Sequence, residues 1–461
     1  MKMEDMILVS VDDHVCEPPD MWERHVPAKW KDRAPRMVHK VDGSDVWVFE
    51  GQQIPNVGLN AVAGRAPEEY GMEPTALAQL RRGCFDVDAR IDDMNVNGVL
   101  GSLCFPSVPG FVGELFGKQA KAGNKELAIT MLRAYNDWHI DEWCGAHPGR
   151  FVPLALPPIW DPQEMAAEVH RVAKKGCHAI TFADTPGGLG YPSLHNEHWD
   201  PFWKACSEEG TVVCIHIGSG TGMNLQDPGA PVEIMIATTP STLLAGATEL
   251  VFSPVFPKFP DLKIALSEGG TGWIPYFLER IDYVHAHHHK WTHHTFPNGK
   301  KPSEMFRQHV ITCFIDDAVG VRNRDLIGVD NMTWECDYPH SDTTWPNAPE
   351  ILWRSVGSIP DADIHKITWQ NVVRHFQYDP FKHIPKEECT VRALRAKAKH
   401  VDVKPRSGGG GKKPSDYERG YCTIGDIMKQ MAGAFSTPFD SEGHGKVENP
   451  LEHVQKSRGG R

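Results

Sequence analysis

The sequence predicts a closed (β/α)8 barrel over residues 1–380, and two observations support this fold class. Eight short apolar segments alternate with amphipathic segments of helical period. These segments run apolar without alternation, which is typical of parallel strands buried on both faces. They span residues 6–11, 98–105, 150–156, 178–183, 211–217, 262–267, 309–314 and 332–336. Eight such repeats favour closure of the sheet into a barrel.

Two of the helical segments carry clear signals at both ends. An Asp-Pro pair opens the patterns at Asp161 and Asp200, where aspartate suits a cap and proline the first turn. Gly176 and Gly210 follow the last turns of the same patterns, as at a helix C-terminus. An open doubly wound sheet is the structural alternative. No GxGxxG loop follows any strand, so a dinucleotide-binding sheet has little support.

An insertion interrupts the repeat at about residues 40–80, after the first strand. Polar and apolar residues alternate there on both sides of Glu50-Gly51. Alternation around a short glycine-containing turn predicts a β-hairpin.

The chain changes character after residue 380, and we assign residues 381–461 to a linker and C-terminal tail. Residues 404–420 have the glycine-rich, charged composition of a flexible linker. Beyond them, residues 421–435 predict a short helix, and the last residues have a disordered composition. The apolar side chains of that helix share one face: Ile424, Ile427, Met428 and Met431. We expect the tail to grip a partner subunit, in a homo- or hetero-oligomer formed through the barrel and the tail.

The composition limits the partners and the compartment. Of the 461 residues, 60 are acidic and 48 are basic, which argues against nucleic acid or an anionic membrane as the main partner. The eleven cysteines are scattered singly, the N-terminus lacks a signal-peptide pattern, and we find no apolar run of ~20 residues. These features predict a cytoplasmic protein that acts on a small molecule.

Acidic and imidazole side chains stand where several of the predicted strands end. In a barrel, catalytic groups belong to the C-terminal ends of the strands. Asp12 and His14 close the first strand, and their period-two spacing places both on one face. The other strand ends supply His216 after the fifth strand, Glu268 after the sixth, and Asp337 with His340 after the eighth.

Each of these residues alone has an ordinary structural explanation. A lone His216 on a strand is more often a core histidine, Asp12 suits a cap, and Asp337 before Tyr-Pro suits a turn. Their coincidence at one barrel mouth favours a metal site instead. Imidazole and carboxylate together suit zinc, iron or manganese, and an open coordination position leaves room for water or substrate.

Longer motifs resemble the amidohydrolase-related family that includes aminocarboxymuconate-semialdehyde decarboxylase. The motifs are VSVDDHVCEPPDMWERHVP, LHNEHWDPFWKACSEEGTVVCIHIG, FPDLKIALSEGGTGWIPYFLERID, ECDYPHSDTTWP and HKITWQNVVRHF. They cover residues from about 8 to 376. The resemblance implies metal ligands at Asp12, His14, His216 and Asp337. Asp12 departs from the family, because many members have histidine there.

A second departure lies at the end of the sixth strand. The family decarboxylases carry a catalytic histidine in a His-Gly-Gly pattern, whereas this chain has Glu268 in Ser-Glu-Gly-Gly. A carboxylate can still move protons where burial raises its pKa. Alternatively, Glu268 and His340 hold a second metal, as in the dinuclear non-haem oxygenases that resemble this branch, such as 2-aminoisobutyrate hydroxylase. The candidate catalytic residues are therefore Asp337, Glu268 and His340.

Three classes of function follow from the resemblance. The first is a metal-dependent hydrolase or non-oxidative decarboxylase acting on a small carboxylate or amide-type substrate. The second is a dinuclear iron or manganese oxygenase, or a subunit of one. The third is a non-catalytic subunit with a structural metal. The cofactor is one divalent metal per chain, or two, drawn from zinc, iron and manganese. The histidine-rich run 285–294 is expected to be a solvated helix end rather than a metal site.

Overall fold

The protein is an eight-stranded parallel barrel. The computed structural model describes residues 1–461 except 56, 72–73, 221–226, 409–412, 433–436 and 440–461. The strands are β1 (Val9–His14), β5 (Gly101–Phe105), β6 (Phe151–Val152), β7 (Ala179–Thr181), β8 (Val212–His216), β9 (Lys263–Ser267), β10 (Val310–Phe314) and β11 (Met332–Trp334). Their order is β6-β5-β1-β11-β10-β9-β8-β7, and a parallel bridge between Ala155 and Ile180 joins the two edges. All eight predicted strands are present, so the barrel prediction is confirmed.

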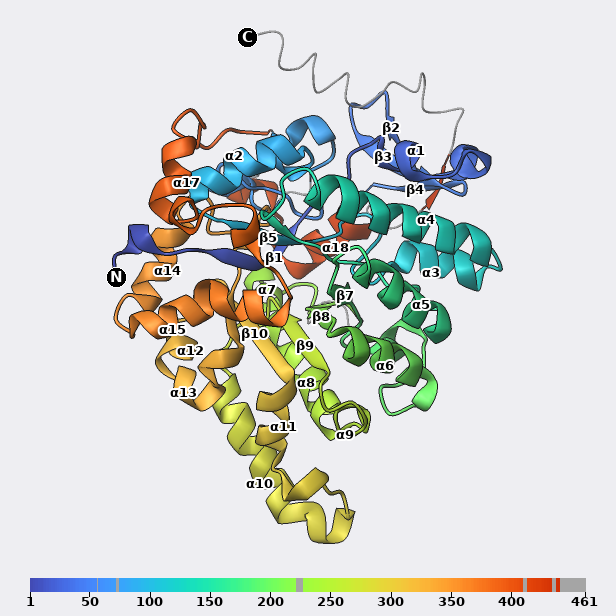
Figure 1. Ribbon diagram of the computed structural model, residues 1–461. Helices are drawn as coiled ribbons and strands as arrows, with labels where there is room; N and C mark the ends of the chain where they lie inside the picture. Colours follow the sequence, from blue (N-terminus) through green and yellow to red (C-terminus); the bar gives the residue numbers. More distant parts are fainter. Residues whose placement is uncertain (56, 72–73, 221–226, 409–412, 433–436, 440–461) are drawn as a thin grey trace.

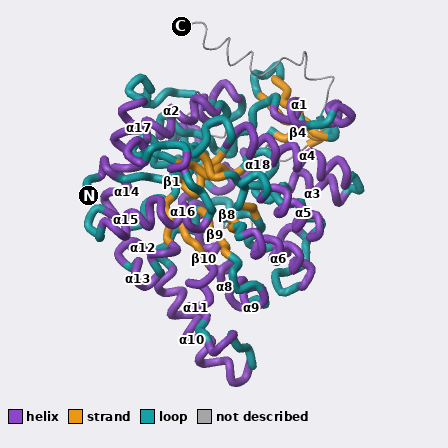
Figure 2. Tube along the Cα trace, in the orientation of Figure 1, coloured by secondary structure: helices purple, strands orange, loops and turns teal. Residues whose placement is uncertain are grey.

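Helices surround the barrel on its outer side (Figures 1 and 2). They are α1 (Met21–His25), α2 (Val87–Asn97), α3 (Glu114–Lys121), α4 (Lys125–Asp137), α5 (Pro162–Ala173), α6 (Asp200–Glu209), α7 (Val232–Thr238), α8 (Thr242–Phe252), α9 (Val255–Lys258), α10 (Ile274–Thr292), α11 (Pro302–His309), α12 (Ala318–Arg322), α13 (Arg324–Ile327), α14 (Ala348–Val356), α15 (Asp361–His365), α16 (Asn371–His375), α17 (Val391–Lys397) and α18 (Ile424–Ala432). Asp161 caps α5 as predicted, accepting hydrogen bonds from the backbone of Gln163 and Glu164. Asp200 is instead the first residue of α6, and Gly210 ends that helix in a left-handed conformation.

The strands bury both of their faces, which explains their unbroken apolar sequences. One face packs inside the barrel, where Val11, Phe105 and Cys214 belong to a single apolar cluster. The other face packs against the helices, as Ile215 and Leu266 do. Burying each such side chain contributes about 1.5–3 kcal/mol. This two-sided core holds the strand ends, and therefore the side chains at the barrel mouth, in fixed positions.

The predicted insertion is an antiparallel sheet beside the barrel. Strands β2 (Arg36–His39), β3 (Asp45–Phe49) and β4 (Gln52–Ile54) follow β1 in the chain, and Glu50-Gly51 forms the turn between the last two. Strand β12 (Thr437–Pro438), from the far end of the chain, pairs with β4 and completes the sheet. Trp47 of β3 packs edge-on against Trp22 of α1 at 5.1 Å between ring centroids. The hairpin prediction is confirmed.

The segment that directly follows residue 380 differs from the predicted linker. Val391 and Leu394 of α17 are buried, and the backbone N–H of Val391 donates to the carbonyl of Met6 at 2.9 Å. Arg395 forms a two-pronged ion pair with Glu350 of α14. Buried apolar side chains and this ion pair hold α17 against the barrel. The packed unit therefore extends beyond 380, and the linker-like composition begins only near residue 404.

The predicted tail helix is present as α18, and it contacts its own chain. The segment before α18 forms an antiparallel bridge between Thr423 and Pro231, and Ile424 N–H donates to the carbonyl of Ala230 at 2.9 Å. Ile424 is buried, whereas Met428 is exposed. The side chain of Met431 and residues 440–461 lie outside the described residues. Gripping of a partner subunit by the tail stays a prediction.

One stretch corrects the sequence prediction that no run is long and apolar enough to cross a membrane. Residues 232–252 pass that test of length and composition, as the single such stretch in the described part of the chain. The stretch is not one regular helix, because the 3-10 turn Thr239–Ser241 divides it into α7 and α8. Leu243, Ala247 and Leu250 of α8 are buried in the core between the helices and the barrel.

Candidate metal centre

The structure brings the six predicted site residues together at the C-terminal mouth of the barrel. Asp12 and His14 lie at the end of β1, and His216 ends β8. Glu268 directly follows β9, whereas Asp337 and His340 lie in the turn after β11. Because parallel strands all end at the same edge, residues more than 300 positions apart in the sequence converge here.

The shortest contacts in the cluster join imidazole nitrogens to carboxylate oxygens. His14 Nε2 lies 3.5 Å from Asp12 Oδ1 and 3.3 Å from Asp337 Oδ1. His216 Nε2 lies 3.6 Å from Asp12 Oδ2. Asp12, His14 and Asp337 are fully buried, and His216 is nearly so. These four residues are the set that the sequence predicted for the first metal.

Many polar atoms of this cluster have no hydrogen-bond partner within the part of the chain that the structure describes. They are both carboxylate oxygens of Asp12 and Asp337, both ring nitrogens of His14, and Nε2 of His216 and of His340. Buried polar atoms are almost always paired, because leaving one unpaired costs about 1–3 kcal/mol. A bound cation would give several of them a partner, taking one nitrogen from each coordinating ring. The cluster therefore fits a divalent metal.

The spacing of the ligand atoms supports the same conclusion. Two overlapping groups have atoms close enough to share an ion, Asp12–His14–His216 and His14–Asp337–His340. His216 donates from Nδ1 to the backbone carbonyl of Ile217 at 2.8 Å, which leaves Nε2 as the nitrogen with a free lone pair. Nitrogen and carboxylate ligands of this kind suit zinc, iron or manganese.

The electrostatics of the site favour positive charge. Burial raises the pKa of Asp12 well above its usual value, and the carboxylates of Glu335, Glu268 and Asp337 raise it further. Burial also lowers the pKa of His216 to about 4, so its ring is neutral at neutral pH. For Asp337 burial alone would raise the pKa, but the adjacent His340 and His14 rings outweigh it and hold the pKa low. The crowding that raises the pKa of Asp12 would be relieved by a cation, which stabilises ionised carboxylates beside neutral imidazoles.

Glu268 and His340 lie at the edge of the cluster, and each contacts a different residue of it. Glu268 Oε2 lies 3.2 Å from His216 Nε2. His340 Nδ1 lies 3.1 Å from Asp337 Oδ1, and its ring stacks on His14 at 3.7 Å between centroids. His340 thus groups with His14 and Asp337 rather than with Glu268. A second metal held jointly by Glu268 and His340 stays a prediction.

Two further buried carboxylates, which the sequence analysis did not single out, accept hydrogen bonds that help to hold the residues of this cluster in place. Asp13 accepts hydrogen bonds from Ser10 Oγ at 3.1 Å, from Ser102 Oγ and from the backbone N–H of Tyr338 at 3.0 Å. It therefore ties β1 to the turn that carries Asp337. Burial raises the pKa of Asp13 to about 6, against the lowering effect of Arg90.

Glu335 is the second supporting carboxylate. Its Oε2 accepts from the backbone N–H of Glu268 at 3.1 Å and from the Cys313 thiol. Glu268 has a φ of 61°, a left-handed conformation that costs energy outside glycine. Glu335 thus helps to hold the strained residue. The sequence contained a signal for Glu335, because it precedes Asp337 by two residues. Side chains two residues apart along an extended strand lie on the same face.

Aromatic rings wall one side of the cluster. Phe111 stacks on His216 at 4.1 Å between ring centroids, and Phe105 meets the same ring edge-on at 5.0 Å. Phe105 ends β5, whereas Phe111 lies in the loop that follows it. This apolar wall limits the access of water to His216. Sequence analysis missed Phe111 because nothing in the sequence shows which way a loop folds.

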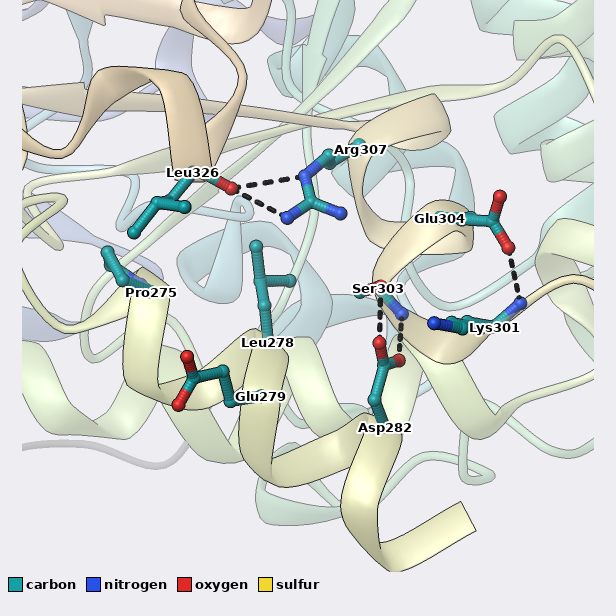
Figure 3. Close-up of a pocket in the computed structure, with 9 residues that line it drawn as sticks. All are labelled: Pro275, Leu278, Glu279, Asp282, Lys301, Ser303, Glu304, Arg307 and Leu326. Carbon is teal, nitrogen blue, oxygen red and sulfur yellow. Dashed lines mark hydrogen bonds between the residues drawn. The ribbon is translucent and has the colours of Figure 1, made fainter. Parts of the chain in front are cut away.

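A separate surface cleft lies at the root of α10 (Figure 3). It encloses about 290 Å³, and none of its lining residues belongs to the metal cluster. Those residues are Pro275, Leu278, Glu279, Asp282, Lys301, Ser303, Glu304, Arg307 and Leu326.

Comparison with known families identifies the chain. Residues 25–377, most of the sequence, match the amidohydrolase family. The chain belongs to this family. Asp12 and His14 precede the matched range, so their assignment depends on the geometry given above. Family membership and the buried ligand set make this amidohydrolase a metal-dependent enzyme, as the sequence predicted.

Curated relatives of this amidohydrolase include two kinds of decarboxylase. The chain is 24% identical over 310 residues to 2-amino-3-carboxymuconate-6-semialdehyde decarboxylase of Dictyostelium discoideum, covering 66% of this chain and 80% of the relative. It is 25% identical over 342 residues to gamma-resorcylate decarboxylase of Rhodococcus jostii, covering 70% and 95%.

Solved structures confirm the fold. An amidohydrolase from Mycobacterium avium subsp. paratuberculosis superposes with a TM-score of 0.62 at 21% identity, over 80% of this chain and 99% of that one. A 5-carboxyvanillate decarboxylase from Novosphingobium aromaticivorans, crystallised with manganese, superposes with a TM-score of 0.54 at 18% identity, over 82% and 99%.

Proposed function

We propose that this amidohydrolase is a non-oxidative decarboxylase of small aromatic or unsaturated carboxylic acids. The observation that carries the proposal is the buried cluster of imidazoles and carboxylates at the barrel mouth. The curated decarboxylases, by their names, act on acids of this class, and they match this chain over most of their length.

In this proposal Asp12, His14, His216 and Asp337 hold one divalent metal. When bound, the metal would supply positive charge that binds oxygen atoms of the substrate and stabilises negative charge that develops during the reaction. Manganese suits the site best among the three candidates, because two carboxylate ligands make it harder than a histidine-rich zinc site. A related decarboxylase contains manganese.

Glu268 is the residue we assign to the proton transfer. Decarboxylation breaks the bond between the carboxyl group and its carbon, releases CO2 and leaves the electron pair on that carbon. A proton from the Glu268 carboxyl group then forms the new C–H bond. Glu268 lies at the edge of the cluster beside His216, and its side chain is more exposed than that of His216. His340 supports the site by holding Asp337 in place.

Hydrolysis is the other reaction that this site could support. Asp337 would then accept the proton of an attacking water and pass it to the leaving group. The two reactions differ in their products, because only decarboxylation releases CO2.

A direct assay tests the proposal. The enzyme would be prepared separately with manganese, zinc and iron, and CO2 release would be measured with 2,6-dihydroxybenzoate, 5-carboxyvanillate and unsubstituted benzoate. We expect about one metal per chain, the fastest turnover with manganese, and deuterium at the vacated carbon when the reaction runs in D2O. Absence of CO2 release from every acid by metal-loaded enzyme would contradict the proposal.

A dinuclear oxygenase is the second candidate, because the two ligand groups together offer more donor residues than one ion needs. Three histidines and three carboxylates supply enough ligands for two ions. Two iron or manganese ions per chain together with O2 consumption would establish this function instead. One metal per chain and anaerobic turnover would exclude it.

We also infer a reducing, cytoplasmic location. All eleven cysteines are free thiols, and ten of them are buried. Singly buried thiols behave as small apolar side chains rather than as halves of disulfides.

A further inference from the structure

Helix α10 projects from the body of the barrel (Figure 1). It is 19 residues long, and all of its buried residues lie in the first half: Ile274, Phe277, Leu278 and Ile281. From Asp282 onward no residue of the helix is buried. At ~1.5 Å per residue, the outer half reaches about 15 Å beyond its last buried turn.

Three aromatic side chains form a stripe along the solvent face of this helix. Tyr276, Tyr283 and Trp291 are 69%, 57% and 70% exposed. Their spacing of seven and eight residues places Tyr276 and Tyr283 opposite the buried residues, with Trp291 roughly 60–80° around the helix from them. His287 stacks on Tyr283 at 5.5 Å between centroids, and the Arg280 guanidinium lies 5.6 Å from the same ring.

The root of α10 is rigidly held. Asp282 accepts hydrogen bonds from the backbone N–H of Ser303 at 2.9 Å and from its hydroxyl at 2.7 Å, which braces α10 against α11 (Figure 3). Farther out, Phe296 of the returning chain packs on the inner side of the helix, against His285. The arm therefore keeps its direction and presents the aromatic stripe outward. Aligned exposed aromatics of this kind mark a contact surface.

We propose that α10 is a dimerisation arm that pairs antiparallel with α10 of a second copy of this chain. A two-fold axis at Tyr283 makes the stripe self-complementary. It places Glu279 of each copy opposite His287 of the other, and Tyr276 beside Lys290 and Trp291. An acid then faces an imidazole, and an ammonium group faces an aromatic ring. A symmetric dimer requires this reciprocal pattern.

The charges along the stripe argue against a partner other than a second copy of this chain. Acid, base and aromatic alternate along the helix, with Glu279 and Lys290 at opposite ends of the stripe. A strongly acidic or basic partner would meet a like charge at one of these ends. The dimer contains six of these aromatic side chains, three from each copy, and each buries ~150–250 Å². Together they bring the buried area of the interface towards the ~1,000 Å² typical of specific interfaces.

Sedimentation of a double variant tests the arm. Tyr283→Glu combined with Trp291→Glu places four like charges across the axis, so we expect the dimer to dissociate, with Kd raised about 100-fold or more. Val41→Glu is the matched control, because Val41 is 76% exposed in the insertion. Circular dichroism and metal content would show that both variants fold. A wild-type chain that is monomeric at high micromolar concentration, or a dimer that the double variant leaves intact, would overturn the proposal.

Cross-linking locates the axis independently. Tyr283→Cys places two thiols across the proposed axis, so mild oxidation should give a disulfide-linked dimer on non-reducing gels, whereas Val41→Cys should not. Equal cross-linking of both variants would contradict an axis at Tyr283. Co-sedimentation with anionic phosphatidylserine vesicles separates the membrane alternative. Vesicle binding that is lost in the double variant would assign the stripe to a lipid surface and overturn the dimer.

Discussion

At the scale of single residues, the centre depends on a few side chains whose partners come from distant strands. Asp12 adds a carboxylate to a cluster that already contains Asp337 and Glu268. Glu335 lies directly behind them. This number of carboxylates favours a harder metal than zinc. We therefore expect changes to these side chains to affect both metal binding and turnover.

His216→Ala should abolish metal binding and activity together. The variant removes the one ligand that β8 supplies and leaves Asp12 without its neighbour at 3.6 Å. We expect metal content to fall by about tenfold or more and turnover by about 10³-fold, measured by elemental analysis and by CO2 release. His309→Ala, which removes a buried histidine outside the cluster, should retain its metal. Full activity of metal-free His216→Ala would refute the assignment.

Glu335→Leu should impair turnover more than metal binding. It removes the acceptor of the Glu268 N–H and leaves that left-handed residue less restrained. We expect kcat to fall about 10–100-fold while metal content is kept. Glu335→Gln should recover part of this loss, because a carboxamide oxygen still accepts the hydrogen bond. Equal losses in both variants would indicate that the charge of Glu335 matters rather than its hydrogen bond.

At the scale of elements, the sequence was sufficient for the strands and for the polar residues that gather at the barrel mouth. Apolar runs such as 211–217 identified β8 because a strand buried on both faces must be apolar throughout. Residues such as His216 stood out against that background. Phe111 could not be found in this way, because its position depends on a loop. The packing of Val391 on the barrel could not be predicted either, because a short apolar helix in a charged segment resembles a linker by composition.

The π-helical segment Trp138–Cys144, which continues α4, contains a pH-sensitive residue. Burial lowers the pKa of His139 from 6.5 to about 4. Between these values the unfolded chain binds a proton that the native protein excludes, so stability falls as the pH falls from about 6.5 towards 4. The slope is about 1.4 kcal/mol per pH unit for one proton.

His139→Gln should flatten this dependence. The wild type should lose about 2 kcal/mol more stability between pH 7 and pH 5 than the variant, measured by denaturant unfolding of metal-free protein. His400→Gln changes an exposed histidine and should behave as the wild type does. Parallel curves for His139→Gln and the wild type would show that His139 does not contribute to the dependence.

At the scale of the whole molecule, the C-terminal tail connects parts that are distant in the fold. Its described segment binds the loop at Gly229 and Ala230, which follows β8 and therefore His216. Strand β12 then reaches the insertion sheet. The tail thus contacts both the segment that precedes α7 and the insertion sheet.

Deletion of residues 413–461 separates a role in the active site from a role in assembly. The deletion removes the contact of Arg419 with Gly229 at 2.8 Å and the pairing of Thr423 with Pro231. We expect KM to rise about tenfold, with metal content and oligomeric state unchanged, because the dimerisation arm is intact. A changed number of chains per particle, determined from the sedimentation mass, with unchanged kinetics would instead support gripping of a partner subunit by the tail.

The convergence of Asp12 and Asp337 on one centre has a consequence for biosynthesis. The ribosome makes the first ligand among the earliest residues and the last after about three quarters of the chain. At ~5–20 residues per second, the growing chain spends many seconds with β1 exposed and its acidic end unpaired. Three of the four ligands, Asp12, His14 and His216, lie in the first half of the chain, and Asp337 completes the set only when β11 has been made. A metal held by all four ligands therefore binds a barrel whose closing strand has already arrived, so metal shortage would deplete activity before it depletes folded protein.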